Sequence, residues 1–469
     1  MKIKRLWVKL VGLAAVLVLT LGLATSGSST QSSRNVIFFH PDGYGLSHWT
    51  ALRVYLAGPD GRLNWDQLPY WGLYTGHTKN SVTGSSHGTL TTNAYGVRVP
   101  WNSYGMYGDQ RAITALSGQQ MSIMEEAIKA GFATALVNSA SVTDPGTGVF
   151  VASSEGWFGY EEGIAKQIIE SGVEVILSGG ERWLLPEGLQ GRHGVGSRTD
   201  GVNLIERARE LGYTVVFTRD ELLLAAADPA ITRVLGVFAH GATYNALSEE
   251  TLRVRQLPLY WPWAPTVAEM SAAAIEILSR NAKAAERGIF LVVEEEGTDD
   301  FPNANNARGS FEAGSRTDEA LGVFAEFVKN NANTLLITTA DSNAGGKQIS
   351  GTDLQSMIQA GAVVEGNVTK TFVNTSPGPA GEGEWALAPL DGVDGAGTPV
   401  FWSAPDAAGV RHPFVVGWAT NRDVVGDTLV RAKGLNAQRV SELGVVDSTD
   451  VYRIMYYTLF GRWLGSPSP

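Results

Sequence analysis

The sequence predicts an α/β fold with a central, mostly parallel sheet. From residue 35 onward, short apolar segments with the composition of strands alternate with segments whose apolar residues recur every three or four positions. This order is typical of βαβ units, in which helices connect parallel strands. In addition, strand candidates such as LLITT (335–339) are apolar on both faces, as a strand covered by helices on both sides must be.

The predicted strands are short runs of β-branched and apolar residues. In chain order they span 35–39, 133–138, 173–177, 214–217, 234–238, 289–293, 335–338 and 414–418. The last one follows residues 374–413, which are rich in Gly, Ala and Pro and which we interpret as an inserted excursion that roofs a site. We expect 414–418 to be the last strand.

The predicted helices carry apolar stripes with a period of 3.6 residues. They span 121–131, 160–172, 201–212, 266–282, 317–331 and 448–463. Several of them end in Gly or Asn, which is typical of helix C-termini. We expect the last helix to pack back onto the sheet.

The N-terminal residues have the pattern of a secretory signal peptide. A basic start (Lys2, Lys4, Arg5 and Lys9) precedes an apolar run over 10–24 and a tail rich in Ser, Gly and Thr. The alternative is an uncleaved membrane anchor, since the run is near the lower length limit for a spanning helix. We expect a signal peptide (1–26), a linker (27–34) and one large domain (35–463), and therefore export to the periplasm or the extracellular space without stable membrane association after cleavage.

Composition excludes several classes of partner and site. The net charge of −11 argues against a nucleic acid or an anionic membrane as partner, because both attract clustered Lys and Arg. The chain has no cysteine, which excludes disulfides, thiolate metal sites and a cysteine nucleophile. An acidic protein that acts on an anionic substrate needs local positive charge, and bound cations are one source of it.

Carboxylates follow three of the predicted strands. Asp42 follows the first, Asp341 follows 335–338, and the run EEEGTDD after 289–293 contains Glu294 and Asp299 as well as Glu295, Glu296 and Asp300. Because parallel strands end at one edge of a sheet, these side chains are expected to converge there and to need cations. The alternative is that each is an ordinary acidic loop residue.

A hydroxyl-rich segment precedes a short predicted helix. NSVTGSSHG (80–88) places Ser85 and Ser86 where free backbone N–H groups and the helix dipole would stabilise an alkoxide and bind an anionic ester. The alternative role is a serine N-cap. The segment 138–150 also offers Asp144 and Thr147 as oxygen ligands, although Asp-Pro-Gly is common in ordinary turns.

This order of residues resembles the alkaline phosphatase family. The resemblance covers about 35–463 and includes 185–223, 234–239, 264–279 and 446–461. It implies a three-layer α/β/α sandwich, a small-molecule phosphate ester as substrate, a phosphoserine intermediate and a possible homodimer. The helix register favours Ser86 as the nucleophile over Ser85, and His87 is a candidate acid, base or ligand.

The resemblance also assigns metal ligands. Asp42 matches an aspartate that bridges two metal positions, Glu294 and Asp299 match a Glu-to-Asp pair, and Asp341 matches a later aspartate. The positions of three family histidines hold Asn303, Ser342 and Asp423. The arginine with which the family clamps phosphate falls near Trp157.

Replacing imidazoles by oxygen donors favours Mg²⁺, Ca²⁺ or Mn²⁺, whereas the resemblance by itself implies Zn²⁺. The predicted function is therefore metal-dependent hydrolysis of phosphate esters, with monoesters as the leading substrates. The alternatives are a phosphodiesterase on the same scaffold and a non-catalytic homologue that binds a metal or a phosphorylated ligand.

Overall fold

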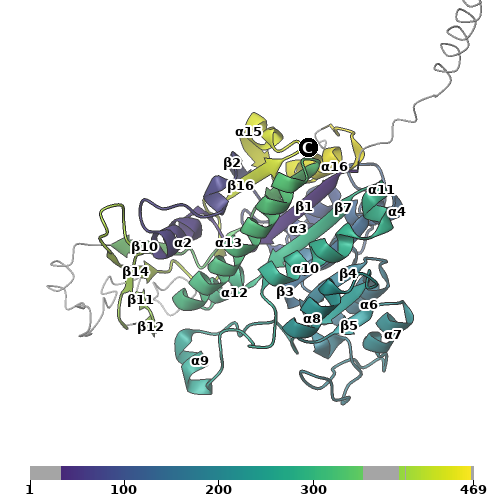
Figure 1. Ribbon diagram of the computed structural model, residues 1–469, viewed down its shortest axis with the longest axis horizontal. Helices are drawn as coiled ribbons and strands as arrows, with labels where there is room; N and C mark the ends of the chain where they lie inside the picture. Colours follow the sequence, from purple (N-terminus) through teal and green to yellow (C-terminus); the bar gives the residue numbers. More distant parts are fainter. Residues whose placement is uncertain (1–32, 352–389, 397, 466–469) are drawn as a thin grey trace, which may run out of the picture. The chain divides into compact units, whose positions relative to one another are not determined.

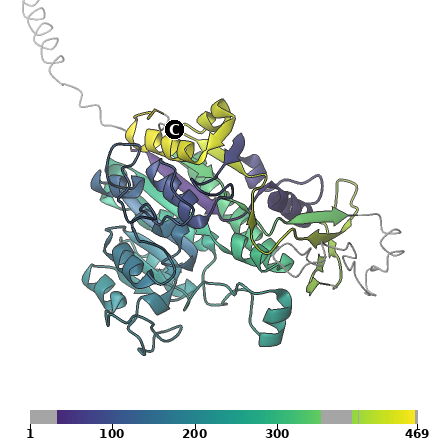
Figure 2. The same cartoon turned by 180° about the vertical axis from the view of Figure 1, so that it is seen from behind.

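The computed structural model describes residues 33–351, 390–396 and 398–465. These residues are organised around a ten-stranded sheet with helices on both faces (Figures 1 and 2). In order across the sheet, the strands are β17 (Val445–Asp447), β2 (Tyr70–Thr75), β16 (Leu429–Gly434), β8 (Thr334–Thr338), β1 (Asn35–Pro41), β7 (Ile289–Glu295), β3 (Ala133–Ser141), β4 (Val175–Gly179), β6 (Val234–Val237) and β5 (Thr214–Val216).

The sheet is mostly parallel, as predicted. Every neighbouring pair from β8 to β5 runs parallel. Only β16 breaks the pattern, because it pairs antiparallel with both β8 and β2. The central strand β1 lies between β8 and β7, so the segments that follow these three strands begin side by side.

Alternate residues of the central strand enter two separate cores. Val36 and Phe38 pack into one hydrophobic cluster, and Ile37 and Phe39 pack into the other. This is the period-two alternation of a strand covered on both sides, and it produces the predicted three-layer α/β/α sandwich. The first core is covered by α3 (Ser86–Tyr95), α4 (Ile123–Lys129), α6 (Glu161–Glu170), α7 (Leu204–Glu210) and α16 (Ser448–Phe460). The second is covered by α2 (Leu46–Ala57), α8 (Arg219–Ala227), α10 (Val267–Ser279) and α13 (Ala307–Asn330).

One predicted strand lies in a different sheet. Residues 414–418 overlap β14 (Pro413–Gly417), which belongs to a small antiparallel sheet with β10 (Gln348–Gly351), β11 (Asp391–Gly392), β12 (Gly395–Ala396) and β13 (Phe401–Trp402). The edge of the main sheet is formed instead by β16, β2 and β17, which the sequence analysis missed. Strand β2, which lies next to the edge strand β17, exposes Trp71 and Leu73, so its apolar residues did not mark a buried strand. The helix predicted over 317–331 begins earlier, at Ala307.

The remaining elements are short. They are α5 (Pro145–Gly148), α9 (Glu249–Arg255), α11 (Ala282–Glu286), α12 (Gly297–Asn303), α15 (Gln438–Leu443), the two-stranded pair β9 (Asn343–Ala344) and β15 (Asp423–Val424), and the 3₁₀ turns Trp65–Gln67 and Glu181–Trp183.

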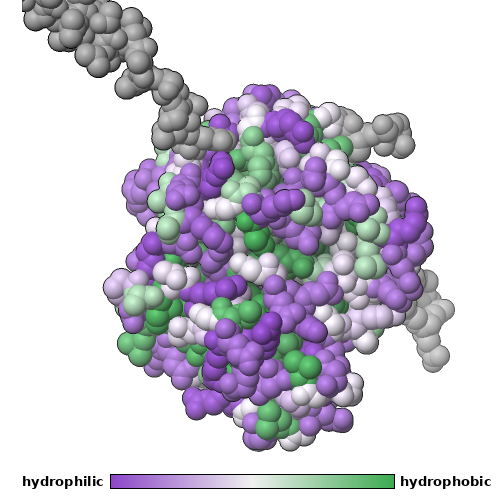
Figure 3. Space-filling model, turned by 90° about the vertical axis from the view of Figure 1, so that its right-hand side faces the viewer, coloured by the Kyte–Doolittle hydropathy of each residue, from purple (hydrophilic) through white to green (hydrophobic). Residues whose placement is uncertain are grey.

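The predicted signal peptide (1–26), most of the linker (27–34) and residues 374–389 and 397 of the predicted excursion lie outside the described residues. Within the described ranges, no helix combines the length and hydrophobicity that a bilayer span requires. The face shown in Figure 3 is largely hydrophilic, with apolar residues in small separate groups, as is ordinary for a protein surface.

Candidate active site

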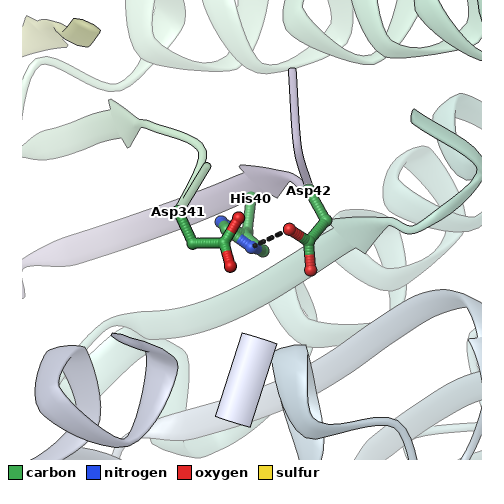
Figure 4. A group of neighbouring side chains, drawn as sticks. All are labelled: His40, Asp42 and Asp341. Atoms are coloured by element: carbon green, nitrogen blue, oxygen red, sulfur yellow. Dashed lines mark ion pairs between the residues drawn. The ribbon is translucent and has the colours of Figure 1, made fainter. Parts of the chain in front are cut away.

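The ends of β1, β7 and β8 bring the predicted carboxylates together. The register pairs His40 with Glu294 across β1 and β7, while β8 pairs with the other side of β1. Asp42 and Glu294 are fully buried, and Asp341 is 4% exposed. Figure 4 shows that His40, Asp42 and Asp341 point toward one another from adjacent strand ends, with ligand atoms within 4.8 Å of each other. The predicted convergence is therefore present in the structure.

His40 has a defined orientation in this cluster. Its Nδ1 lies 2.9 Å from the carbonyl oxygen of Thr339, which can only accept, so Nδ1 carries the proton. This leaves Nε2 facing the carboxylates, 3.3 Å from Asp42 Oδ1 and 4.0 Å from Glu294 Oε1. His40 thus offers a ring nitrogen to the space between the acidic side chains.

A second group consists of Asp42, Glu294 and Glu296, whose oxygens also lie within 4.8 Å of one another. The amide of Asn138 donates to Glu294 Oε2 and to Thr147 Oγ1. The chain passes so close to Glu294 that a Cβ at position 146 would lie 1.6 Å from Glu294 Oε1, so only glycine fits there.

Asp144 and Thr147 both lie beside this second group, in the turn after β3. Asp144 caps α5, where its Oδ1 accepts from the backbone N–H of Gly146 at 3.2 Å. Burial raises the pKa of Asp144 to about 7. Both residues are 2% exposed.

Asp299, Asn303 and Asp423 form a third contact group. Asn303 donates its amide to Asp299 Oδ2 at 2.8 Å and to Asp423 Oδ1 at 2.9 Å. Its amide oxygen accepts from the backbone N–H of Gly345 at 3.0 Å. In this arrangement Asn303 holds two carboxylates together, and its oxygen is already engaged. Ser342, at the adjacent strand end, is buried and its hydroxyl has no hydrogen-bond partner among the described residues.

The electrostatics of this region favour bound cations. Burial and the neighbouring carboxylates raise the pKa values of four acids well above their ordinary range: Glu294, Glu296, Asp299 and Asp341. Burial would also raise the pKa of Asp42, but the net shift is downward, because His40 attracts this carboxylate and polar side chains that include Ser86 lie close to it.

Buried oxygens without a hydrogen-bond partner among the described residues point into the cluster. They are both carboxylate oxygens of Asp42 and Asp341, Glu294 Oε1, Glu296 Oε2, Asp299 Oδ1 and Ser342 Oγ. Buried polar groups are almost always paired, and buried charges need a counter-charge. Orphaned oxygens of this kind fit divalent cations, which are bound by oxygen ligands.

The two candidate nucleophiles differ in how they are engaged. Ser85 is the N-cap of α3: its hydroxyl accepts from Gly88 N at 3.1 Å and donates to Trp101 O at 2.7 Å, and the residue is 2% exposed. Ser86 is the first residue of the helix and is half-buried. Its hydroxyl contributes to the lowered pKa of Asp42, which places it beside that carboxylate. The geometry therefore favours Ser86, at the positive end of the helix dipole.

His87 turns toward aromatic residues. Its ring centroid lies 5.7 Å from that of Trp101 and 5.4 Å from that of Trp157, and Phe158 stacks on Trp157. Burial lowers the pKa of His87 to about 4, against the attraction of Asp42, so its imidazole is neutral at neutral pH.

Three residues of the site had no individual role assigned from the sequence, although Glu296 and Asp300 were expected to converge with the other carboxylates. Glu296 belongs to two of the acidic groups, and Asp300 and Asn138 also lie in the site. The alternation of side chains along a strand could have identified Glu296, because residues two apart point to the same side and Glu294 was already predicted. Asn138 follows no such pattern, and only the packing of β3 against β7 reveals its contact.

Comparisons with known proteins point to one family. A family model described as "Alkaline phosphatase" matches residues 33–460. The alkaline phosphatase of Escherichia coli (strain K12) is 28% identical over 344 residues, which cover 67% of this chain and 70% of that protein. The tissue-nonspecific isozyme of Rattus norvegicus is 26% identical over 349 residues, which cover 67% of this chain and 63% of that protein, so less than two thirds of its length is matched.

Solved structures show the same fold. The alkaline phosphatase of Thermus thermophilus superposes with a TM-score of 0.66 at 24% identity, and the match covers 94% of this chain and 95% of that one. The enzyme of the Antarctic bacterium TAB5 gives a TM-score of 0.64 at 18% identity, covering 92% of this chain and 99% of that one. A substituted form of the TAB5 enzyme has Mg bound in a site called M3.

Proposed function

The chain belongs to the alkaline phosphatase family and is a phosphoric ester hydrolase, and from this premise we propose that it hydrolyses phosphate monoesters through a phosphoserine at Ser86. The observation that carries the proposal is the position of Ser86, at the N-terminus of α3 and beside the buried Asp42 carboxylate. The family assignment also sets aside the alternative of a non-catalytic binding homologue.

In the proposed reaction Ser86 Oγ attacks phosphorus, and the ester oxygen leaves with the alcohol. Water then attacks the same phosphorus, releases inorganic phosphate and restores the Ser86 hydroxyl. The backbone N–H groups of Ser86 and His87, at the start of α3, have no partner within the helix and would bind the phosphoryl oxygens. Ser85 acts through its cap, since it fixes the end of the helix on which Ser86 stands.

Alkaline phosphatases use divalent metal ions, and the orphaned oxygens of Asp42, Glu294 and Asp341 fit such ions here. When bound, the ions would neutralise charge on the phosphoryl group and lower the pKa of the nucleophile. We propose Mg²⁺, Mn²⁺ or Ca²⁺, because oxygen atoms dominate the donor set and His40 is its one imidazole. Mg bound to a substituted form of the TAB5 enzyme is consistent with this choice. If only Zn²⁺ restores activity to chelated protein, this assignment of the metal is wrong.

Phosphodiester hydrolysis is the second candidate. The region where an arginine clamp was expected presents the rings of Trp157 and Phe158 beside His87. Without a guanidinium, the second negative charge of a monoester has one partner fewer, which favours diesters relative to other family members. Relative rates on p-nitrophenyl phosphate and bis(p-nitrophenyl) phosphate decide between the two: a higher kcat/KM for the diester would overturn the monoester proposal.

Export and assembly complete the proposal. The N-terminal pattern supports secretion, with small phosphate esters hydrolysed in the periplasm or outside the cell. Family resemblance supports a homodimer. Sequencing the mature N-terminus from an exporting host tests the first point, since cleavage is expected near residue 26. Light scattering of the purified protein tests the second.

A further inference from the structure

A compact acidic group lies directly after β7. The carboxylates of Glu296, Asp299 and Asp300 each have an oxygen within 4.8 Å of the others. Opposite ligands of Ca²⁺ stand about 5 Å apart, because each lies about 2.3–2.6 Å from the ion, so three oxygens this close can share one cation. The family resemblance assigns a metal-binding role to Asp299 and to neither of the other two.

The hydrogen bonding leaves oxygens in this group unused. Glu296 is 6% exposed and its Oε2 has no partner among the described residues, and the same is true of Oδ1 of Asp299, which is 9% exposed. Asp300 is held by Tyr244, whose hydroxyl donates to Oδ2 at 2.7 Å. Tyr244 is buried against Phe301, so Asp300 has a fixed direction while its second oxygen stays available.

Within the part of the chain that the structure describes, the charges that act on Glu296, Asp299 and Asp300 are those of other carboxylates. None of the ion pairs formed among the described residues includes Glu296, Asp299 or Asp300. Glu295, one residue away, differs in this respect: it lies on the opposite side of the strand, near Arg316, and its Oε1 accepts from Ser139, Gly297 and Tyr260.

We propose that Glu296, Asp299 and Asp300 form an additional site for a hard divalent cation, beside the positions built on Asp42. Glu296 also belongs to the group with Asp42 and Glu294, so the additional site adjoins the main centre through this residue. In this proposal, carboxylates of the β7–α12 turn take over part of the cation binding that the resemblance assigns to histidines absent from this chain.

The test is cation stoichiometry, which does not depend on catalysis. Asp300→Asn is the key variant, because Asp300 takes part in this group alone and asparagine keeps an acceptor for Tyr244. Metal-free protein is titrated with Mn²⁺, free Mn²⁺ is followed by electron paramagnetic resonance, and bound metal is counted after gel filtration. We expect Asp300→Asn to bind one Mn²⁺ fewer per chain, or to bind its weakest Mn²⁺ at least about tenfold more weakly. Equal numbers and affinities in variant and wild type would overturn the proposal.

Glu295→Gln is the matched control, a buried carboxylate from the same turn, and it should keep the wild-type stoichiometry. Melting temperatures show whether the Asp300→Asn variant is folded, so that a lower Mn²⁺ count can be distinguished from misfolding. In a chelator, Asp300→Asn should melt at or above the wild-type temperature, because one repelling charge is gone, while Mn²⁺ should raise its melting temperature less. An equal rise in both proteins contradicts the site. Wild-type protein that binds the expected number of Mn²⁺ ions but hydrolyses no phosphate ester would count against the proposed function and not against the cation site.

Discussion

The structure predicts that alanine substitutions of Ser85 and Ser86 affect stability and turnover differently. Ser86→Ala should abolish turnover and leave stability almost unchanged, whereas Ser85→Ala should lower stability and reduce turnover much less. The reason is that Ser86 stands half-buried at the first position of α3 beside Asp42, while the Ser85 hydroxyl is buried in two hydrogen bonds.

The magnitudes follow from those contacts. Losing the Ser85 cap costs about 1 kcal/mol of folding free energy, and leaving the Trp101 carbonyl unpaired costs about 1 kcal/mol more. Ser86→Ala removes no such pair and should stay within about 0.5 kcal/mol. Loss of the nucleophile should lower kcat on the order of 10³-fold or more, equal to about 4 kcal/mol of transition-state stabilisation. Ser85→Ala moves the helix end and should cost less than about 10²-fold.

The assay combines p-nitrophenyl phosphate kinetics with melting temperatures at one fixed metal concentration. Ser85→Thr is the control, because its hydroxyl should restore most of the lost cap. If Ser86→Ala keeps more than about a tenth of wild-type activity while Ser85→Ala is inactive and stable, Ser85 is the nucleophile and the geometric argument fails.

Further predictions concern the metals, the substrate and the pH dependence. Changing Asn303, Ser342 and Asp423 together to histidine should shift metal preference toward Zn²⁺, measured by competition between Zn²⁺ and Mg²⁺ for chelated protein, and an unchanged preference would show that these positions do not contact the ions. Gly146→Ala should displace Glu294, since the new Cβ would lie 1.6 Å from Oε1, and should weaken Mn²⁺ binding at least about tenfold; normal binding would mean that the turn adapts. Trp157→Arg should raise the monoester-to-diester ratio of kcat/KM by about tenfold, and a constant ratio would place this residue away from the substrate. Burial raises the pKa of Asp391 to about 8, against about 3.9 unfolded, so the folded chain holds an extra proton between these values and loses stability as pH rises. Asp391→Asn keeps an acceptor for the Trp418 indole but cannot ionise, so its melting temperature should rise relative to that of the wild type from about pH 4 to about pH 8 and then keep a constant lead, and parallel curves over this range would refute the shift.

Much of the fold could be predicted from local pattern. The strand LLIT lies in β8, and the stripe over 266–282 contains α10, because the period of apolar residues reports how many faces of a segment are buried. The errors lie where burial is partial. Strand β2 exposes Trp71 and Leu73, and β14 has strand composition whichever sheet it joins. The sheet that a strand joins, and its position in that sheet, depend on contacts between residues that are distant in sequence.

The residues of the candidate active site also differ in how far the sequence could predict them. Asp42, Glu294 and Asp341 could be predicted, since a carboxylate after a buried parallel strand must lie at the edge where such strands end. The orientation of His40 could not, because its hydrogen bond to Thr339 joins residues 299 positions apart. Likewise, only packing turns the Asn303 amide toward two carboxylates and its oxygen toward Gly345.

By itself, then, the sequence determined the layered architecture, the edge at which acidic residues gather and the helix start that presents a serine. The tertiary structure decided which of the two serine hydroxyls is engaged as a helix cap, which carboxylates lie close to one another and which rings lie beside His87. The physical reason is that the spacing of apolar residues along a segment reports which of its faces are buried. The contacts of each side chain depend instead on strands and turns that meet only after the chain has folded.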